Sequence, residues 1–348
     1  KIAVAKWFAL LGIQNTDSST TADVTLVFRT PGVAAPAATI TGISIPPQST
    51  YYLNTQTSTL PEVTGLGDWK GSVEATATNG VKLAGNSIQF NTNNLTKGLH
   101  NALTTSEQAN KFYLPLMHSQ GSQTPGFIGW LGWLAILNPT GTDITVDIAL
   151  NGTNLATNSP LNTTVNNLLV PANSLVEFQA SQAPAIGATT RWKGSVVVTG
   201  DSGATFYAEM TNARLLGAGK TNVYYLYKGL QSGSATTIYF PYFESTSSYR
   251  SWRVIQNAGT VSTDLTFTFY NFDGSVAATT AATGVPSGGF SEIFAYNETN
   301  GPGKSWSGAL KVESSGSQPI QGYATMCNDG ALASSSFDLC GTYLGITE

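Results

Sequence analysis

Apolar and polar residues alternate with a period of two along most of the chain. Clear examples are "VTLVF" (24–28), "ITVDIAL" (144–150) and "LTFTFY" (265–270), which also contain the β-branched and aromatic residues typical of strands. Gly, Pro, Asn and Ser interrupt these runs, and only residues 104–112 resemble a short helix. About seven short strands in roughly 110 residues predict an all-β fold, a two-sheet antiparallel sandwich of immunoglobulin-like size.

This strand pattern occurs three times in the same order. Each copy has a strand that ends in Asn, an Asp that opens the next strand, a Pro turn and a W-x-G motif; the asparagines are Asn15, Asn138 and Asn257. The motifs read "WKGSVEA" (69–75), "WKGSVVV" (192–198) and "WSGALKV" (306–312). A period of roughly 115–125 residues indicates a tandem array. We predict three domains, at 1–98, 99–228 and 229–348.

The second and third copies open with a strand that the first copy lacks. These strands are "KFYLPLMHS" (111–119) and "IYFPYFEST" (238–246), whereas Lys1 to Lys6 run into Trp7 without a turn. The first sandwich is therefore predicted to have an unpaired edge, which recruits foreign strands unless it is blocked. We expect the C-terminal tail of one subunit to complete the first sandwich of another, so that deleting 330–348 leaves monomers. The predicted subunit contact comprises Ile2, Val4, Phe337, Tyr343, Leu344 and Ile346.

Composition and charge narrow the range of partners. Only 10% of the residues are charged and the net charge is −4, so the chain offers no basic field for nucleic acid. The uncharged run 126–137 is shorter than the roughly 20 apolar residues of a spanning helix, so no membrane span is predicted. The apolar segment 7–15 aligns with a strand of the second copy, which indicates part of the fold and not a signal peptide. We expect a mature secreted protein, or a record trimmed to its ordered part.

The chain has two cysteines, Cys327 and Cys340, both in the third copy. A disulfide between them is favoured over two buried thiols because the protein is expected to be exported. Closing a loop of this size contributes roughly 3 kcal/mol in the chain-entropy model.

The sequence offers little to catalysis or metal binding. His100 and His118 lack a Cys, Asp or second His at metal-ligand spacing, and we interpret both as surface or loop residues. Asp23, Asp143 and Asp264 each stand alone at a turn, where a carboxylate usually accepts hydrogen bonds from its own turn. We therefore predict no catalytic residue, no metal site and no cofactor.

The seven tryptophans allow two interpretations. Most recur at equivalent positions, as a shared core requires, since a buried indole contributes a large packing area. The predicted core tryptophans are Trp7, Trp69, Trp133, Trp192, Trp252 and Trp306. The other interpretation is stacking on glycans, for which the doubled pair Trp130 and Trp133 is the candidate. Four sequons, in what we interpret as loop or turn contexts, are candidate glycosylation sites, at Asn94, Asn151, Asn162 and Asn297.

The order Y-[LF]-P, W-x4–8-N, D-[VIL]-T, Pro turn and W-x-G-[SA] resembles the tandem immunoglobulin-like sandwich repeats of secreted and cell-surface structural proteins of filamentous bacteria. The similarity covers nearly the whole chain, although the first copy lacks the Y-[LF]-P strand. It implies an extracellular, structural role and supplies no catalytic residue. We expect a non-enzymatic subunit of an extracellular filament or surface layer that associates with copies of itself. The alternative is an adhesin that binds cell-surface carbohydrates.

Overall fold

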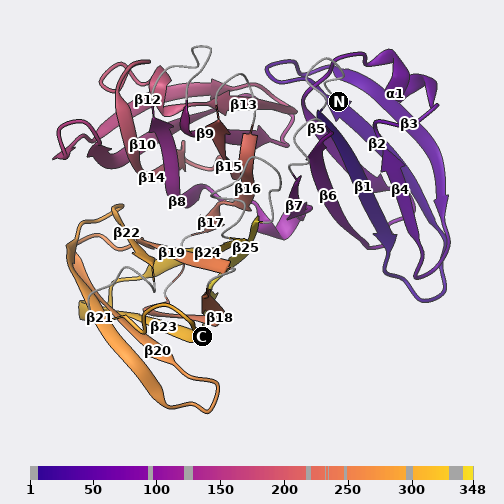
Figure 1. The fold of residues 1–348 in the computed structure, drawn as a ribbon. Helices are drawn as coiled ribbons and strands as arrows, with labels where there is room; N and C mark the ends of the chain where they lie inside the picture. Colours follow the sequence, from indigo (N-terminus) through magenta and orange to yellow (C-terminus); the bar gives the residue numbers. More distant parts are fainter. Residues whose placement is uncertain are drawn as a thin grey trace.

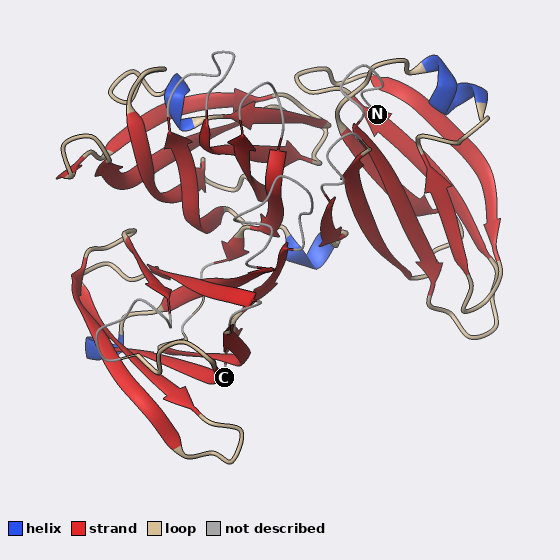
Figure 2. Cartoon of the chain, in the orientation of Figure 1, coloured by secondary structure: helices blue, strands red, loops and turns tan. Residues whose placement is uncertain are grey.

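The structure is a computed structural model that describes residues 7–92, 97–120, 128–216, 221–231, 233, 235–246, 249–294, 301–328 and 340–347. The described chain is almost entirely antiparallel β-structure (Figures 1 and 2). Its helical segments are short: α1 (Pro61–Gly65) and 3₁₀ turns at Thr105–Glu107, Ala180–Gln182 and Ser315–Ser317. The segment 104–112 therefore contributes one capped turn and not a helix. No helix in the described residues is long and apolar enough to span a membrane.

The first group of strands forms two separate sheets. One has the order β4-β1-β6-β7 and the other the order β3-β2-β5. The strands are β1 (Trp7–Asn15), β2 (Ala22–Arg29), β3 (Pro36–Ile45), β4 (Thr50–Asn54), β5 (Ser72–Ala77), β6 (Leu83–Asn91) and β7 (Lys97–Asn101). Alternate residues of β2 are fully buried, as the period of two predicts.

The second group forms a sheet in which β10-β14-β8-β9-β15-β16 are consecutive neighbours. Strand β8 pairs along β14 but meets β9 only at Ser119 and Leu131, so the sheet folds over at β8 into two layers. The strands are β8 (Lys111–Gln120), β9 (Ile128–Asn138), β10 (Ile144–Asn154), β11 (Ser159–Pro160), β12 (Thr163–Val170), β13 (Ser174–Phe178), β14 (Arg191–Gly200), β15 (Tyr207–Leu216), β16 (Thr221–Lys228) and β17 (Leu230–Gln231).

The third group repeats this path as β20-β23-β18-β19-β24-β25. Strand β18 meets β19 at one pair, Ser245 and Arg250, so it has the place that β8 has in the second group. The strands are β18 (Thr237–Ser245), β19 (Tyr249–Asn257), β20 (Thr263–Tyr270), β21 (Val276–Val285), β22 (Phe290–Phe294), β23 (Trp306–Ser314), β24 (Ile320–Asn328), β25 (Cys340–Leu344) and β26 (Ile346–Thr347).

Strand pairing extends the first two groups past the predicted boundaries. The boundary at 98 falls inside β7, which pairs with β6 as far as Asn101. The boundary at 228 precedes β17, which pairs with β8. Backbone hydrogen bonds therefore hold residues 97–101 in the first group and 230–231 in the second. The first group has a core of its own, whereas one apolar cluster runs from the second group into the third.

A buried asparagine ties the two layers together in each group. Asn15 ends β1 and its Nδ2 donates to the carbonyl of Ile45 in β3, at 2.9 Å. Asn138 ends β9 and donates to Val170 of β12, and Asn257 ends β19 and donates to Val285 of β21. All three side chains are fully buried. The recurring Asn of the sequence is thus a bridge that satisfies buried carbonyls between the two layers of each group.

Candidate functional site: an open sheet edge

Strand β5 lies at the end of its sheet and has no second neighbour among the described residues. In the order β3-β2-β5 it pairs only with β2, whereas β14 and β23 each pair on their second side with β8 and β18. The three strands are equivalent because each follows the Trp of a W-x-G motif. An exposed edge of this kind presents unpaired N–H and C=O groups to another strand.

The interior beside β5 is also incompletely covered. Val73 and Ala75 lie opposite Phe28 and Leu26, which are fully buried, so both face the core side of the sheet. Ala75 is nevertheless exposed and Val73 is half-buried. Their counterparts in β14 and β23 are buried under β8 and β18; these are Val196, Val198, Leu310 and Val312.

The opposite layer shows the same difference. Leu11 lies four residues before Asn15 and is half-buried, whereas Leu134 and Arg253, at the same distance from Asn138 and Asn257, have no exposed surface. A strand beside β5 would cover Leu11, Val73 and Ala75 together. Among the described residues, the first group therefore differs from the other two at this edge; Lys1 to Lys6, on which the predicted unpaired edge depends, lie outside them.

The W-x-G motif fixes the start of the strand in each group. The indole N–H of Trp69 donates to Thr30 Oγ1 at 3.1 Å, that of Trp192 to the Leu161 carbonyl at 2.9 Å, and that of Trp306 to Asn271 Oδ1 at 3.0 Å. Each ring folds back over the glycine two residues later. A Cβ at Gly194 would overlap the Trp192 ring, with Cζ2 of the ring only 2.3 Å away, so only glycine fits there.

A cavity of about 280 Å³ lies beside this edge, between the first and second groups. Its lining comprises Lys70, Trp133, Glu177, Gln179 and Gln182. Lys70 reaches across from the first group and pairs with Glu177 of β13 at 2.6 Å. Trp133 is half-buried here, whereas Trp252, its counterpart five residues before Asn257, is buried where the third group packs on the second.

Strand β8 packs against β19 at the junction of the second and third groups. The first group has no such strand among its described residues, and the cavity beside Trp133 lies at the corresponding place. The cavity therefore lies where β8 packs in the equivalent junction.

The remaining tryptophans are packed to different degrees. Trp192 and Trp252 are buried, as predicted, and Trp7, Trp69 and Trp306 are half-buried against apolar clusters. Trp130 is not an open stacking platform, because it stacks on His118 with centroids 5.2 Å apart and meets Tyr225 edge-on at 5.9 Å.

The assignment of His118 to the surface is wrong. It lies in β8 with only a small exposed fraction, and burial, together with the charge of Lys193, lowers its pKa to about 3. The continuous apolar run of β8, from Phe112 to Met117, was the signal for this burial. His100 lies in β7, and its side chain is outside the described residues.

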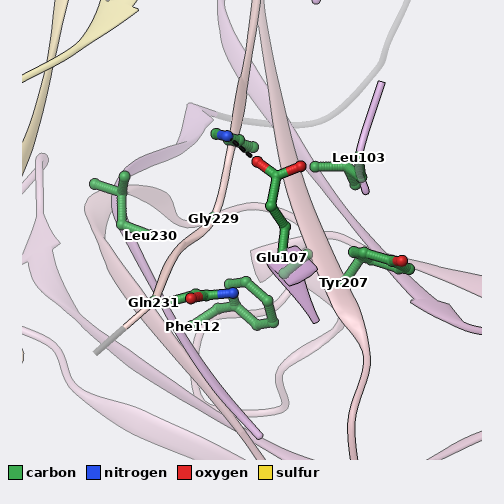
Figure 3. A pocket seen from close by; sticks show the side chains of 9 residues that line it. Leu103, Glu107, Phe112, Tyr207, Gly229, Leu230 and Gln231 are labelled. Carbon is green, nitrogen blue, oxygen red and sulfur yellow. Dashed lines mark hydrogen bonds and ion pairs between the residues drawn. The ribbon is translucent and has the colours of Figure 1, made fainter. Parts of the chain in front are cut away.

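A second cavity, of about 190 Å³, lies where the segment after β7 meets the start of β8 (Figure 3). Glu107 forms an ion pair there with Lys228, beside Phe112 and Leu230. Burial alone would raise the pKa of Glu107, but hydrogen bonds from Lys228 and Thr104 outweigh it and lower the pKa. The other walls are largely apolar. Because the ion pair joins the segment between β7 and β8 to the end of β16, it fastens the connection between the first two groups.

The C-terminal tail is not free to act as a donor strand, contrary to the prediction. Tyr343 and Leu344 lie in β25, which pairs with β24 of the same chain, and Ile346 lies in β26, which pairs with β18. Pairing satisfies backbone groups of these residues within the third group. Ile2, Val4 and Phe337 lie outside the described residues.

A buried arginine, which sequence analysis missed, anchors this tail. Arg253 has no exposed surface, and its guanidinium lies 4.0 Å from the Phe243 ring centroid and 5.2 Å from that of Tyr343. Arg253 donates to the Tyr343 hydroxyl at 2.7 Å, and both side chains donate to the carbonyl of Tyr242. Burial lowers the pKa of Arg253 to about 9. No pattern around Arg253 distinguishes it from the exposed cations of a strand.

The disulfide prediction is confirmed. Cys327 is disulfide-bonded, and Cys340, the other cysteine of the chain, lies opposite it in the β24–β25 register. The bridge therefore fastens the tail to the third group. In the part of the chain that the structure describes, no cluster of His, Cys, Asp or Glu could hold a metal ion.

The candidate glycosylation sites differ in their setting. Asn162 is exposed between β11 and β12, and its Oδ1 accepts from Gly152. Asn151 lies within β10, opposite Ser195, so the expected loop context is wrong for it. Asn94 and Asn297 lie outside the described residues.

The carboxylates of Asp143 and Asp264 accept backbone N–H groups of Ala172 and Gly284. These donors lie twenty or more residues further along the chain, so the carboxylates fasten neighbouring segments and not their own turns. For Asp23 the corresponding partner is not seen.

Comparisons with known proteins add little to this geometry. No family model matches the chain, and no curated protein matches it. Among solved structures, Thermotoga maritima protein 1070 is similar at 10% identity and a TM-score of 0.26, over 36% of this chain and 95% of that one. The exported protein XepA of PBSX is similar at 9% identity and a TM-score of 0.16, over 62% of this chain and 90% of that one. The VP2 subviral particle of infectious bursal disease virus gives 11% identity and a TM-score of 0.16, over 98% and 72%.

Proposed function

We propose that the protein is a non-enzymatic structural subunit of an extracellular assembly, such as a filament or surface layer, and that it associates with its own copies through the open edge of β5. The proposal treats the three strand groups as tandem immunoglobulin-like sandwiches, of which the first accepts a strand from another copy. It assigns no catalytic residue, metal or cofactor. A disulfide in the third group supports an oxidising, exported location.

The observation that carries the proposal is the threefold comparison of one strand position. Strands β14 and β23 have their partners β8 and β18, while β5 has none among the described residues and leaves core-facing Ala75 exposed. Strand addition to such an edge satisfies backbone hydrogen bonds and buries the inner face at once. Each bound strand joins one copy to another.

Ala75→Lys tests this edge. A charge that points into the sheet blocks strand addition, and because Ala75 is exposed the substitution leaves the isolated fold intact. The control is Thr76→Lys, on the neighbouring exposed residue that faces outward. We expect Ala75→Lys to lower the mass of the assemblies in light scattering and negative-stain images, and Thr76→Lys to leave it unchanged.

A labelled peptide of residues 111–119 provides a direct readout. It copies the strand that fills the equivalent edge in the second group, so it should bind the wild-type chain and not the Ala75→Lys chain. A wild-type chain that stays monomeric at high concentration, or an Ala75→Lys chain that assembles as before, would overturn the proposal.

Carbohydrate binding is the second candidate function, and Trp133 is the observation that favours it. Its half-buried indole lines a cavity whose other walls are the polar side chains of Lys70, Glu177, Gln179 and Gln182. An aromatic face with a few polar groups is typical of small-ligand sites. Binding on a glycan array that is lost in Trp133→Ala but retained in Trp130→Ala would favour the adhesin.

A further inference from the structure

In the second and third groups, one sheet face points away from the group's own core; we call it the outer face. Each outer face is covered by the group before it in the chain. On the third group, Trp252, Val254 and Tyr323 are buried although they face away from its own core. They pack on β16 of the second group, where Tyr227 stacks on Tyr323 with centroids 4.2 Å apart and Tyr225 meets Trp252 at 6.3 Å.

The second group is covered in the same way by the first. Tyr224 and Leu226 share its outer face with Trp133, and Trp7 packs on them, with its ring centroid 4.8 Å from that of Tyr224. Tyr224 also donates to Gln89 of β6 at 2.6 Å.

The same ion pair marks both junctions. Lys70 and Lys193 are the middle residues of W-K-G motifs. Lys70 pairs with Glu177 of the second group, and Lys193 pairs with Glu292 of the third. Glu177 and Glu292 lie opposite Ala135 and Val254, each three residues before the buried Asn, so they are equivalent positions. The chain therefore uses one type of junction twice.

The first group carries the same outer face, which is only partly covered among the described residues: Phe8 is buried, whereas Leu10 and Ile88 are half-buried. Phe8 lies opposite Phe90, and Leu10 lies opposite Ile88, which in turn lies opposite Leu99 of β7, so these five side chains share a face. Leu10 has the position of Trp133 and Trp252, five residues before the buried Asn. Leu99 is 59% exposed.

Tyr52 completes this face. It lies opposite Gly12, three residues before Asn15, which is the position of Glu177 and Glu292. Tyr52 is 65% exposed. Tyr52 and Leu99 thus expose large side chains on the two edge strands of this sheet, β4 and β7, and exposed apolar patches mark contact sites.

The third group also has the surface that the first and second groups each use to cover the next group, around its W-x-G motif. Its W-x-G motif has Ser307 where the other two have Lys70 and Lys193. Near it Phe272, 72% exposed, stacks on Tyr242, 41% exposed, with centroids 6.4 Å apart. Phe272 lies eight residues after Asp264.

In the first and second groups, the position eight residues after the recurring Asp faces the next group. Counted from Asp143, the equivalent residue is Asn151, whose amide lies beside Gly288 of the third group. Counted from Asp23, it is Pro31, next to Gly32, which donates to the carbonyl of Leu175 in the second group.

We infer that the third group of one copy docks on the outer face of the first group of a second copy, with the geometry of the two internal junctions. The charges at the two surfaces support the third group as the occupant. Each internal junction has a Lys–Glu pair, and in the proposed contact both members are uncharged: Ser307 stands in place of the lysine and Tyr52 in place of the glutamate. A lysine against Tyr52 would be desolvated without a counter-charge. Such a contact is heterologous and does not close, so it propagates as a filament. The inference rests on the proposed self-association but uses a surface other than the β5 edge.

The experiment is made in the Ala75→Lys chain, so that only the second contact is measured. Sedimentation velocity over a concentration series should show reversible association of Ala75→Lys, and Tyr52→Glu should weaken it at least tenfold. Adding Ser307→Lys should restore it, because the new pair recreates the Lys–Glu contact of the internal junctions. Thr39→Glu, on an exposed residue of β3, is the control and should change nothing.

Each outcome bears on one surface. Unchanged association in Tyr52→Glu, or weakening that Ser307→Lys fails to restore, overturns this docking geometry whatever the peptide experiment shows at β5. A β5 edge that binds no peptide while the Tyr52 and Ser307 series behaves as expected overturns the edge proposal alone. Circular dichroism and thermal melts of each variant show that the fold is retained.

Discussion

The buried asparagine at the end of β9 should be worth several kilocalories per mole to the second group. Asn138 Nδ2 donates to the carbonyls of Thr142 at 2.8 Å and Val170 at 3.1 Å, and its Oδ1 accepts from the Thr140 N–H at 2.9 Å. The substitution Asn138→Ala removes all of these bonds and leaves a cavity the size of an amide.

The size of the stability loss depends on how far the carbonyl and N–H groups bonded to Asn138 are buried from water. The Val170 carbonyl is buried, and an unsatisfied buried group costs about 1–3 kcal/mol. The bonds to residues 140 and 142 are partly buried, and each contributes about 1 kcal/mol net. We expect a loss of about 3 kcal/mol in the free energy of unfolding.

Guanidinium denaturation followed by tryptophan fluorescence measures this loss. The control is Asn154→Ala, on an asparagine of β10 whose Oδ1 accepts one bond, from the exposed Ala156 N–H at 2.9 Å; we expect below 1 kcal/mol. Asn138→Asp keeps the shape but turns an oxygen toward the carbonyls, and should cost at least as much as the alanine. A loss for Asn138→Ala no larger than that of the control would refute the account of Asn138 as a bridge between layers.

Three further predictions concern single features of the fold. Gly194→Ala should destabilise the second group by about 3 kcal/mol in the same denaturation assay, because its Cβ would collide with Trp192, whereas Gly141→Ala, with open space around it, should be nearly neutral. Replacing Cys327 and its partner by alanine should cost the third group about 3 kcal/mol, measured by calorimetry; an unchanged transition would mean that the bridge constrains nothing. The buried imidazole of His118 has its pKa lowered from about 6.5 to about 3, so its contribution to stability is present above pH 6.5 and is lost as the pH falls toward 3; His118→Gln should flatten this part of the stability profile, and parallel profiles would contradict the assignment.

Deleting residues 340–348, which contain the described part of the 330–348 tail, should not leave the folded monomer that the sequence predicted for loss of the whole tail. Those residues include β25 and β26, which pair with β24 and β18, and Tyr343 covers the buried guanidinium of Arg253. Their loss leaves a buried charge with fewer partners, which is strongly destabilising. We expect partial unfolding of the third group, seen as an early calorimetric transition, and not a folded monomer.

Local pattern was sufficient for the strands and for the positions that repeat. The alternation in 24–28 and 265–270 corresponds to β2 and β20, and the recurring asparagines and W-x-G glycines have one structural role in all three groups. These features depend on residues within one sheet pair, so the sequence of each copy contains them.

Features that depend on packing between layers or between groups were not predictable in the same way. The pair of Lys70 and Glu177 joins residues 107 apart that no spacing relates. The burial of His118 depends on Trp130 stacking over it, and the pairing of the tail depends on β24 and β18 having free sides. Each requires knowing which surface faces which, and alternation along a strand does not contain that information.

The two proposed contacts lie on different sides of the first group, which determines how they would combine. The β5 edge ends the sheet β3-β2-β5 beside the second group, where Lys70 meets Glu177. The face with Leu10 and Tyr52 belongs to the outer side of the other sheet, β4-β1-β6-β7. One rigid neighbour cannot fill both, so the two contacts would join a copy to different neighbours. Docking on Tyr52 would then join copies head to tail into a thin thread, and strand addition at β5 would join such threads side by side. Electron micrographs should accordingly show single thin threads for Ala75→Lys and short lateral clusters for Tyr52→Glu.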